Sequence, residues 1–197
     1  DLPNTKEEFE LNLDYLIDEV KNKRNLIWIY IDIQRSDFIP IATKRGFFFH
    51  SCDEGYILVV KRIKENAIIP TAANHTLGVG AVVINDKNEI LVIKERISNL
   101  GYKLPGGHID NGEMISTAVS REVLEETGII VEFESIISLG HFYPHQFHKS
   151  NLYVICTANP KTFEINIQDI EEILDAKWVD VNAYLSDEKV LDYSKAI

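Results

Sequence analysis

The sequence predicts an α/β (α+β) protein built from two domains, residues 1–70 and 75–197. Apolar residues recur at helical spacing near the start of the chain and again around residues 118–124, and β-branched or aromatic runs alternate with these segments. A stretch of small and polar residues, 63–75, separates the two sets and is typical of a linker. The chain has 197 residues and 45% hydrophobic content, which is enough for two small cores.

The first domain is predicted to begin with a helix over residues 6–23. Thr5 and Glu8 have the spacing of a capping box. Apolar residues then recur every three or four positions: Phe9, Leu13, Leu16, Ile17 and Val20. The β-branched and aromatic run Leu26–Ile33 predicts a strand after this helix.

A second helix is predicted over residues 37–45, with Ser36 as its candidate cap. Pro40 falls in the first turn, where its missing amide hydrogen is tolerated. Two strands separated by an Asp-Glu-Gly turn are predicted to follow, Phe47–His50 and Tyr56–Lys61.

The second domain is predicted to open with a hairpin of strands Leu77–Ile84 and Glu89–Lys94 around a polar turn. A helix that Ser116 or Thr117 can cap is predicted to end at Gly128, where a left-handed residue is expected. A late strand is predicted from the segment 176–179.

Charge is concentrated in the second domain. The net charge is −11, and residues 75–197 carry −9 of it, with 10 Lys and Arg against 19 Asp and Glu. Such an acidic surface repels nucleic acid backbones, so no nucleic acid partner is expected. An acidic domain that handles phosphates needs divalent cations between its carboxylates and the substrate.

Membrane and disulfide signals are missing from the sequence. No apolar run approaches the roughly 18 residues that a membrane helix needs, and the first residues lack the features of a signal peptide. The two cysteines, Cys52 and Cys156, show no metal-binding spacing, and we expect reduced, buried thiols. A cytoplasmic protein without a membrane partner is therefore expected.

The stretch 104–129 contains the candidate chemistry. A Pro-Gly-Gly loop and an Asp-Asn-Gly turn precede the predicted helix. Glu122, Glu125 and Glu126 are spaced i, i+3 and i+4, so they are expected on one helix face. Three neighbouring carboxylates repel one another unless a cation lies among them, and Mg²⁺ and Mn²⁺ prefer carboxylate oxygens. The pattern predicts a site for divalent metal ions.

The spacing of this stretch resembles the Nudix box. Five residues separate Gly107 from Glu113, seven more precede Arg121, and every defining position is filled: Gly107, Glu113, Arg121, Glu122, Glu125, Glu126 and Gly128. A purely acidic, solvated helix face would not explain a glycine loop at this fixed distance. The chain is identified on this pattern as a member of the Nudix hydrolase family.

The resemblance extends over about residues 25–181. Ile27–His50 is similar to the pre-Nudix region of the plant ADP-ribose/NADH pyrophosphatases and of the animal Nudix protein encoded antisense to a fibroblast growth factor. Phe147–Tyr153 is similar to a segment after the box in the same group. The resemblance implies a Nudix α/β/α sandwich with a mixed sheet, a preceding small α/β pre-Nudix domain, and a homodimer.

The resemblance also implies a reaction and roles for the box residues. Members of the family hydrolyse a nucleoside diphosphate joined to another group, by water attack on one phosphorus. The implied cofactor is Mg²⁺, for which Mn²⁺ can substitute. The implied metal ligands are Glu122, Glu125, Glu126 and the carbonyl of Gly107. Glu113 and Arg121 can pair across the loop and would support the catalytic geometry.

The general base is left open by the sequence. Family members use either a box glutamate, here Glu122 or Glu125, or a glutamate from a later loop. The loop before the late strand offers Glu171 and Glu172 for this role, and a helix-capping role near an N-terminus is an equal alternative.

An aromatic, mildly basic segment after the box is the candidate substrate contact. Aromatic rings can stack on a purine and a lysine can meet a phosphate. The candidate residues are Tyr143, Phe147, His148 and Lys149. The alternative is an ordinary strand–turn–strand surface with scattered aromatic residues.

Three functions fit the sequence. The first is hydrolysis of ADP-ribose, with NADH as a second substrate; the Gln-Pro-Trp-Pro motif expected of NADH-preferring bacterial members is absent. The second is a Nudix hydrolase of coenzyme A, dinucleoside polyphosphates or oxidised nucleotides. The third is a non-catalytic nucleotide-binding regulator, a class that tends to lose the box carboxylates, all of which are present here.

Overall fold

The chain forms two compact units. The computed structural model describes residues 2–98, 101–188 and 190, and it divides the chain into Asp1–Ala73 and Asn74–Ile197. The division falls inside the segment 63–75 that the sequence indicates as a linker. Each unit has a hydrophobic core of its own.

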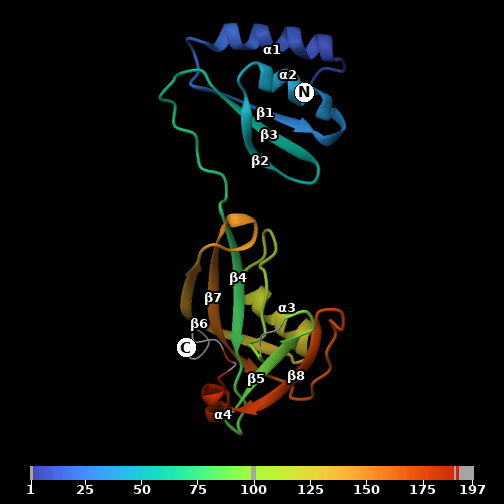
Figure 1. Ribbon diagram of the computed structural model, residues 1–197, viewed down its shortest axis with the longest axis vertical. Helices are drawn as coiled ribbons and strands as arrows, with labels where there is room; N and C mark the ends of the chain where they lie inside the picture. Colours follow the sequence, from blue (N-terminus) through green and yellow to red (C-terminus); the bar gives the residue numbers. More distant parts are fainter. Residues whose placement is uncertain (1, 99–100, 189, 191–197) are drawn as a thin grey trace. The chain divides into compact units, whose positions relative to one another are not determined.

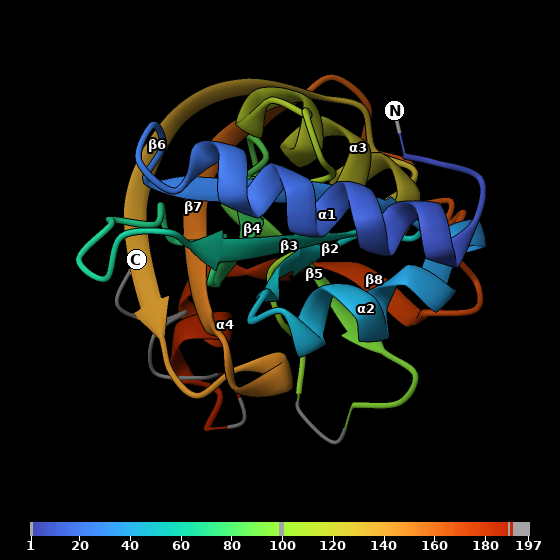
Figure 2. The ribbon, with the colours of Figure 1, turned by 90° about the horizontal axis from the view of Figure 1, so that it is seen from above.

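The first unit is a three-stranded antiparallel sheet, in the order β1-β3-β2, with helices packed on it (Figure 1). Seen from above, α1 runs alongside β1 and β3 (Figure 2). The elements are α1 Lys6–Val20, β1 Leu26–Asp32, the 3-10 helix η1 Ile33–Phe38, α2 Ile39–Lys44, β2 Phe48–Cys52 and β3 Tyr56–Arg62.

The core of the first unit lies between this sheet and its helices. Alternate residues of β1 point to the same face, and three isoleucines are buried on the face that the helices cover. They pack against the apolar side of α1 and against η1 and α2. The main contributors are Ile27, Ile29, Ile31, Phe9, Leu13, Phe38 and Ala42.

The start of α1 agrees with the predicted cap. Thr5 Oγ1 accepts a hydrogen bond from the backbone amide of Glu8 at 3.2 Å, which satisfies one of the free amides of the first turn. The helix ends at Val20, three residues before the predicted end.

The start predicted for the second helix is wrong. Ser36 does not cap it, because the chain turns into η1 directly after β1, with the Asp32 carboxylate accepting from the Gln34 amide at 2.8 Å. α2 then begins at Ile39 with Pro40 in its first turn, where no amide hydrogen is needed. The short side chain of Asp32 bonds locally and competes with the predicted cap.

The second unit contains two sheets. One has the order β4-β7-β6, with β4 parallel to β7 and β6 antiparallel to it, and the other pairs β5 with β8 antiparallel. The elements are β4 His75–Val82, β5 Glu89–Glu95, α3 Ile115–Thr127, β6 Val131–Phe142, the 3-10 helix η2 Gln146–His148, β7 Ser150–Pro160, β8 Ile173–Asp180 and α4 Val181–Ser186.

Strand alternation places apolar layers on both sides of these sheets. In β5, Leu91 packs in a cluster with Ala118, Val119 and other α3 residues. Its neighbours Ile90 and Val92 pack in a different cluster with Tyr184 of α4. The sheets therefore lie between helices, as in the expected α/β/α sandwich with a mixed sheet.

The predicted hairpin of the second unit forms only next to its turn. Ile84 and Ile90 form an isolated antiparallel bridge, and the Leu91 amide donates to Val83 O at 2.9 Å. Beyond this point β4 pairs with β7 and β5 with β8, because each strand finds a longer partner elsewhere in the chain. Local pattern could not show these long-range pairings.

The prediction is correct for the C-terminal end of α3 and wrong for its N-terminal cap. Gly128 has φ +75° and its amide donates to Leu124 O at 2.8 Å, which is the predicted left-handed end. Ser116 and Thr117 do not cap the helix, because it already begins at Ile115, and Met114 at the cap position offers no side-chain bond.

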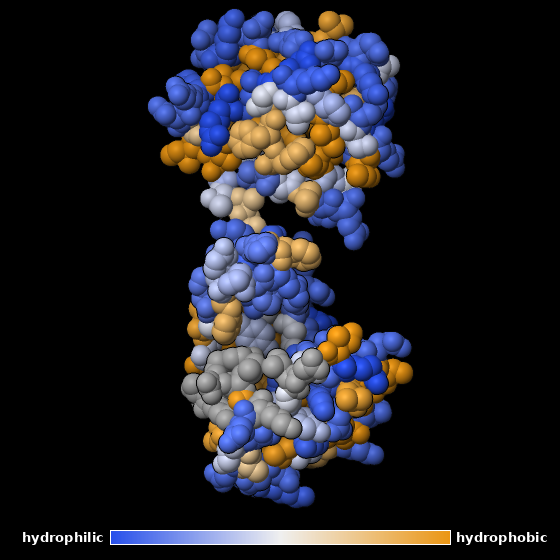
Figure 3. Space-filling view, viewed as in Figure 1, coloured by the Kyte–Doolittle hydropathy of each residue, from blue (hydrophilic) through white to orange (hydrophobic). Residues whose placement is uncertain are grey.

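The cysteine prediction is half correct. Cys156 is buried, and burial raises the pKa of its thiol to about 11, whereas Cys52 is exposed at the end of β2. No helix among the described residues is long and apolar enough to cross a membrane. On the face shown in Figure 3, hydrophilic groups cover most of each unit and apolar groups are scattered among them.

Candidate active site

The glycine loop runs along β4 like an additional strand. The Ala81 amide donates to Pro105 O at 2.8 Å, and the Val79 amide donates to Gly107 O at 2.9 Å. Gly78 and His108 form an antiparallel bridge one step further along. The loop is therefore anchored on the rigid sheet by backbone bonds.

Two positions in this loop require glycine. Gly106 has φ +147°, and a Cβ there would lie 2.1 Å from Val79 O. A Cβ on Gly107 would lie 2.7 Å from Glu122 Oε2. The two glycines thus allow the loop to fit between β4 and the carboxylates of α3.

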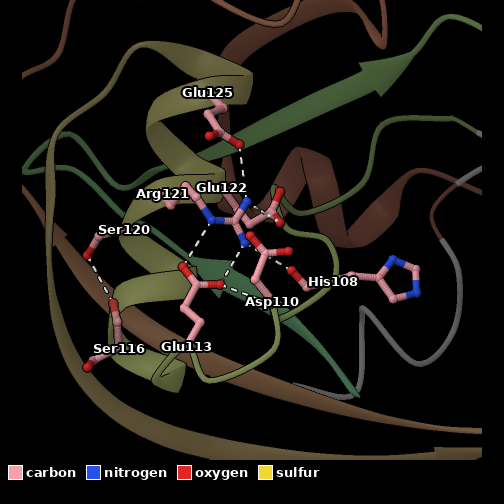
Figure 4. Close-up of polar contacts among 8 residues, drawn as sticks. All are labelled: His108, Asp110, Glu113, Ser116, Ser120, Arg121, Glu122 and Glu125. Atoms are coloured by element: carbon pink, nitrogen blue, oxygen red, sulfur yellow. Dashed lines mark hydrogen bonds and ion pairs between the residues drawn. The ribbon is translucent and has the colours of Figure 1, made fainter. Parts of the chain in front are cut away.

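Arg121 ties this loop to α3 (Figure 4). Its Nε and Nη2 donate to the two carboxylate oxygens of Glu113 at 3.0 and 2.9 Å, and Nη2 also donates to His108 O at 3.0 Å. The hydrogen bonds from Arg121 lower the pKa of Glu113. The pairing expected across the loop is present, and its two-pronged geometry fixes the direction of the guanidinium.

The remaining nitrogen of Arg121 holds two further carboxylates. Nη1 donates to Glu122 Oε1 at 2.9 Å and to Glu125 Oε2 at 3.2 Å. The Glu122 side chain is 13% exposed and the Glu125 side chain 48%. Burial raises the pKa of Glu122, although the charge of Arg121 opposes this effect.

Glu126 points away from this group and into the protein. It is buried, and its Oε2 accepts a hydrogen bond from the Gly106 amide at 2.7 Å. Burial raises the pKa of this carboxyl to about 8, against the opposing effects of Lys103 and the Gly106 amide. A nearby positive charge would stabilise the ionised form of a carboxyl buried in this position.

Lys103 supplies a cation on the Glu126 side of the site. It forms an ion pair with Glu95. Burial lowers the pKa of Lys103, but this pair and the charges of Glu126 and Glu172 outweigh it, so the pKa is raised. The lysine therefore keeps its charge within a partly buried acidic cluster.

The three α3 carboxylates do not converge as expected. Within residues 2–98, 101–188 and 190, no three carboxylate, histidine or cysteine side chains are arranged to hold a metal ion. The i, i+3, i+4 spacing brings the side-chain roots together, but Arg121 holds Glu122 and Glu125 while the Gly106 amide holds Glu126.

The chemistry of these donors still fits a divalent cation. Glu122 and Glu126 are carboxylates whose pKa values are raised by burial, and both are raised further by neighbouring acids. A hard cation that accepts oxygen ligands would relieve both effects. Because Glu113 holds Arg121 through Nε and Nη2, Glu122 and Glu125 can leave Nη1 without freeing the arginine.

The late loop brings one of its two candidate glutamates to the site. Glu172 lines the cavity next to the glycine loop, and its charge acts on the pKa values of Glu122, Glu126 and Lys103. Glu171 does not line that cavity, but it lines a neighbouring pocket that shares Glu95 and Glu172 with it.

The cavity beside the glycine loop has a volume of about 500 Å³, a size typical of small-molecule sites. Its lining includes residues with charged or backbone polar groups: Glu95, Lys103, Gly106, Gly107, His108 and Glu172. It also includes aromatic and amide side chains: Phe142, His145, Gln146, Asn151 and Tyr153.

The predicted substrate residues belong to the segment beside this cavity but do not line it. Tyr143 and Phe147 are 69% and 89% exposed, and His148 and Lys149 are also absent from the lining. Their neighbours line it instead, because residue alternation and the turn at η2 decide which side chains face inward. The alternation of side chains along β7 is the available signal, because it separates Asn151 and Tyr153, which line the cavity, from Leu152, which does not.

Three charged residues at or just after the end of β1 in the first unit are held by local contacts. Asp32 caps η1, Arg35 donates to the carbonyl and side chain of Asn4, and Asp37 pairs with Lys6 at 3.4 Å. These local contacts explain the cluster without a catalytic role.

Comparison with known proteins identifies the family. A family model described as the NUDIX domain matches residues 74–197, and one described as the Nudix hydrolase domain matches residues 1–63. The chain belongs to the Nudix family. The Nudix chain is 38% identical over 160 residues to Nudix hydrolase 8 of Arabidopsis thaliana, an alignment that covers 78% of the chain and 43% of that protein.

One further relative agrees with this assignment, and one solved structure shares the fold. Nucleoside diphosphate-linked moiety X motif 6 of Xenopus laevis is 37% identical over 164 residues, covering 80% of the Nudix chain and 75% of that protein. The NUDIX domain of Shewanella oneidensis NrtR, solved with ADP ribose, shares the fold with a TM-score of 0.53 at 23% identity, covering 64% of the chain and 86% of that domain. The chain spans between 43% and 62% of the length of Arabidopsis Nudix hydrolases 8, 2 and 7.

Proposed function

We propose that this Nudix protein hydrolyses a nucleoside diphosphate joined to another group, with ADP-ribose as its preferred substrate and NADH as a secondary one. The products would be two phosphate monoesters. The relatives named for a nucleoside diphosphate-linked moiety, and the ADP ribose in the NrtR domain, support this choice of substrate class.

One observation carries the proposal. Buried and partly buried carboxylates of the box, Glu122 and Glu126, lie with Glu172 and Lys103 in one electrostatically coupled cluster, and the last two line the 500 Å³ cavity. Perturbed acids at a cavity are characteristic of catalytic sites. An acidic site beside a cavity suits an anionic substrate only when divalent cations accompany it.

The residues that would hold Mg²⁺ are Glu122, Glu125 and Glu126, with the carbonyl of Gly107. When bound, Mg²⁺ neutralises the diphosphate and makes water more acidic; Mn²⁺ can supply the same chemistry.

The remaining steps fall to the side chains of the chain. Glu172 is proposed as the base that accepts a proton from the attacking water, whose oxygen bonds to one phosphorus while the bridging P–O bond breaks. Lys103 would neutralise the charge that develops on the departing phosphate. Arg121, oriented by Glu113, would keep the glycine loop and α3 in register.

Two wider properties follow from the resemblance to the pre-Nudix group. We expect a homodimer that the first unit helps to build, and a cytoplasmic location. Sedimentation of the purified chain measures the first property.

The function is tested by hydrolysis in Mg²⁺, measured side by side on ADP-ribose, NADH, coenzyme A and diadenosine polyphosphates. ADP-ribose should be cleaved with the highest kcat/KM, and chelation of the metal should abolish turnover. Glu126→Gln should reduce kcat by about 100-fold or more, because it removes a charged donor from the metal site. Glu134→Gln, on the exposed part of β6, is the matched control.

The same panel separates the alternatives. Preference for coenzyme A or a dinucleoside polyphosphate would retain the hydrolase and replace the substrate. Binding of ADP-ribose without any turnover in Mg²⁺ or Mn²⁺ would identify a nucleotide-binding regulator and overturn the proposal.

A further inference from the structure

Glycines flank one tyrosine on the cavity face of the second unit. In the register of the β4-β7-β6 sheet, Tyr153 pairs with Gly78 on one side and Gly140 on the other. Gly80 lies two residues beyond Gly78 and so shares its face. Because these three neighbours of Tyr153 are glycines, they add no side chains of their own to the sheet surface around its ring.

The ring of Tyr153 occupies the space above β4. A Cβ on Gly78 would lie 2.8 Å from one edge of the ring (Cδ2), and a Cβ on Gly80 would lie 2.9 Å from the other edge (Cε1). Residues two apart in a strand are separated by roughly 7 Å, so a ring that touches both lies along the strand backbone. The glycines thus let the ring rest on the sheet.

A second ring lies beside it in the same manner. Phe142 is two residues after Gly140 on β6, and a Cβ on Gly140 would lie 2.7 Å from its ring. Phe142 and Tyr153 both line the 500 Å³ cavity. Together they give the cavity an aromatic floor, and Leu104 and Ile155 add apolar surface next to it.

A buried amide adjoins this floor. Asn151 is 7% exposed, lines the cavity and is the register partner of both Thr76 and Phe142. Its Oδ1 accepts a hydrogen bond from Thr76 Oγ1 at 2.9 Å, which orients the amide. Among the described residues nothing accepts a hydrogen bond from Asn151 Nδ2, so this accessible donor is available to a ligand.

The floor adjoins the catalytic loop. Gly78, under the ring of Tyr153, is bridged to His108, the residue that follows Gly107 in the glycine loop. Lys103 and Glu172 line the same cavity. A ligand with a planar aromatic part and a diphosphate part could therefore place the first on the rings and the second at the carboxylates.

We infer that Tyr153, resting on Gly78 and Gly80 and accompanied by Phe142, is the platform on which the nucleobase of the substrate stacks, and that Asn151 Nδ2 donates to an acceptor on the edge of that base. Stacking on aromatic rings holds any base by its flat face, and a purine offers more area than a pyrimidine. This inference deepens the proposed function and relies on its assignment of the site.

The test compares binding of AMP, UMP and ribose 5-phosphate to the full-length chain by calorimetry, in Mg²⁺ and at ligand concentrations up to the millimolar range. The unaltered protein should bind AMP more tightly than UMP. Tyr153→Leu should weaken AMP binding about tenfold or more and leave ribose 5-phosphate binding unchanged. Tyr153→Phe, which keeps the ring, should retain AMP binding to within about threefold.

A glycine substitution tests the platform without touching the tyrosine. Gly80→Ala inserts a methyl group where the ring lies, so it should weaken AMP binding selectively. Gly55→Ala is the control, because a Cβ there meets nothing within 4 Å. Thermal unfolding of each variant shows whether the fold is retained, and only folded variants are compared.

The outcomes separate this inference from the proposed function, because binding of a monophosphate requires no hydrolysis. Selective loss of AMP binding in folded Tyr153→Leu and Gly80→Ala supports the platform even if no diphosphate is cleaved. Equal changes for AMP and ribose 5-phosphate, an unchanged AMP affinity, or no measurable AMP binding to the unaltered protein would each overturn it.

Discussion

At the residue scale, the site depends on how a few charges are shared. Arg121 uses three nitrogens on three carboxylates and a carbonyl, while Glu126 and Lys103 form a second, more buried group. The first group positions the loop, and in the second group Lys103 lines the cavity while Glu126 is buried. Substitutions in the two groups should therefore have different kinetic effects.

Lys103 should matter for the chemical step. Lys103→Met removes the cation beside the cavity and should lower kcat/KM by about 10- to 100-fold, because transition-state charge on the phosphates is less well stabilised. The control is Lys87→Met in the exposed turn before β5. Steady-state kinetics on ADP-ribose, with unfolding curves for both variants, measure the effect. Equal kcat/KM values for the two variants would remove Lys103 from the mechanism.

The two late glutamates form a natural matched pair. Glu172→Gln should lower kcat by about 100-fold or more if Glu172 is the base, whereas Glu171→Gln should stay within about twofold, since Glu171 lies outside the cavity. Single-turnover rates distinguish the chemical step from product release. Wild-type turnover in both variants would assign the base to the box.

At the scale of elements, the glycine loop is held by β4 and cannot move aside. A Cβ on Gly106 would overlap Val79 O, and β4 cannot shift because β7 pairs with it along its whole length. Gly112, at the turn before α3, has φ +84° but open space around it. A side chain at Gly106 would therefore meet both steric overlap and backbone strain, whereas a side chain at Gly112 would meet backbone strain alone.

Substitution of these glycines should destabilise the protein to different degrees. Gly106→Ala should cost about 3 kcal/mol or more of unfolding free energy, because overlap adds to strain. Gly112→Ala should cost only about 1–2 kcal/mol, the penalty of a left-handed conformation. Chemical denaturation measures both costs, and equal costs would contradict the described packing of the loop.

Features that depend on residues close in the chain could be predicted from the sequence, whereas features that depend on strand register could not. The Thr5 cap, the Gly128 helix end and the Glu113–Arg121 pair depend on residues close in the chain, and each is present. The floor of the cavity depends on the register between β4, β6 and β7, which no local pattern contains. For this reason the sequence could not predict that Phe142 and Tyr153 line the cavity whereas Tyr143 and Phe147 do not.

The sequence also could not predict which groups the carboxylates of α3 contact. Helical spacing correctly places Glu122, Glu125 and Glu126 near one another, but it does not say which partner each side chain chooses. Arg121, adjacent to Glu122, and Gly106, on a different segment, make that choice. The spacing of the acids therefore predicts that they share a helix face, but not the contacts that each carboxylate makes.

At the scale of the whole molecule, charge and function are linked. Residues 75–197 carry most of the net charge of −11, yet they contain the cavity proposed for an anionic substrate. Divalent ions resolve this conflict if the α3 carboxylates bind them. Family membership is shown by the matches to both parts of the chain, and metal binding is the physical claim on which the proposed hydrolysis depends.

Titration of the full-length protein with Mn²⁺, followed by electron paramagnetic resonance, tests that claim most directly. The unaltered protein should remove free Mn²⁺ from solution at a site for which Mg²⁺ competes, and Glu122→Gln together with Glu126→Gln should weaken this binding by about 10-fold or more while Glu134→Gln leaves it unchanged. Equal Mn²⁺ binding by the unaltered protein and the double variant, or no binding by either, would contradict the account.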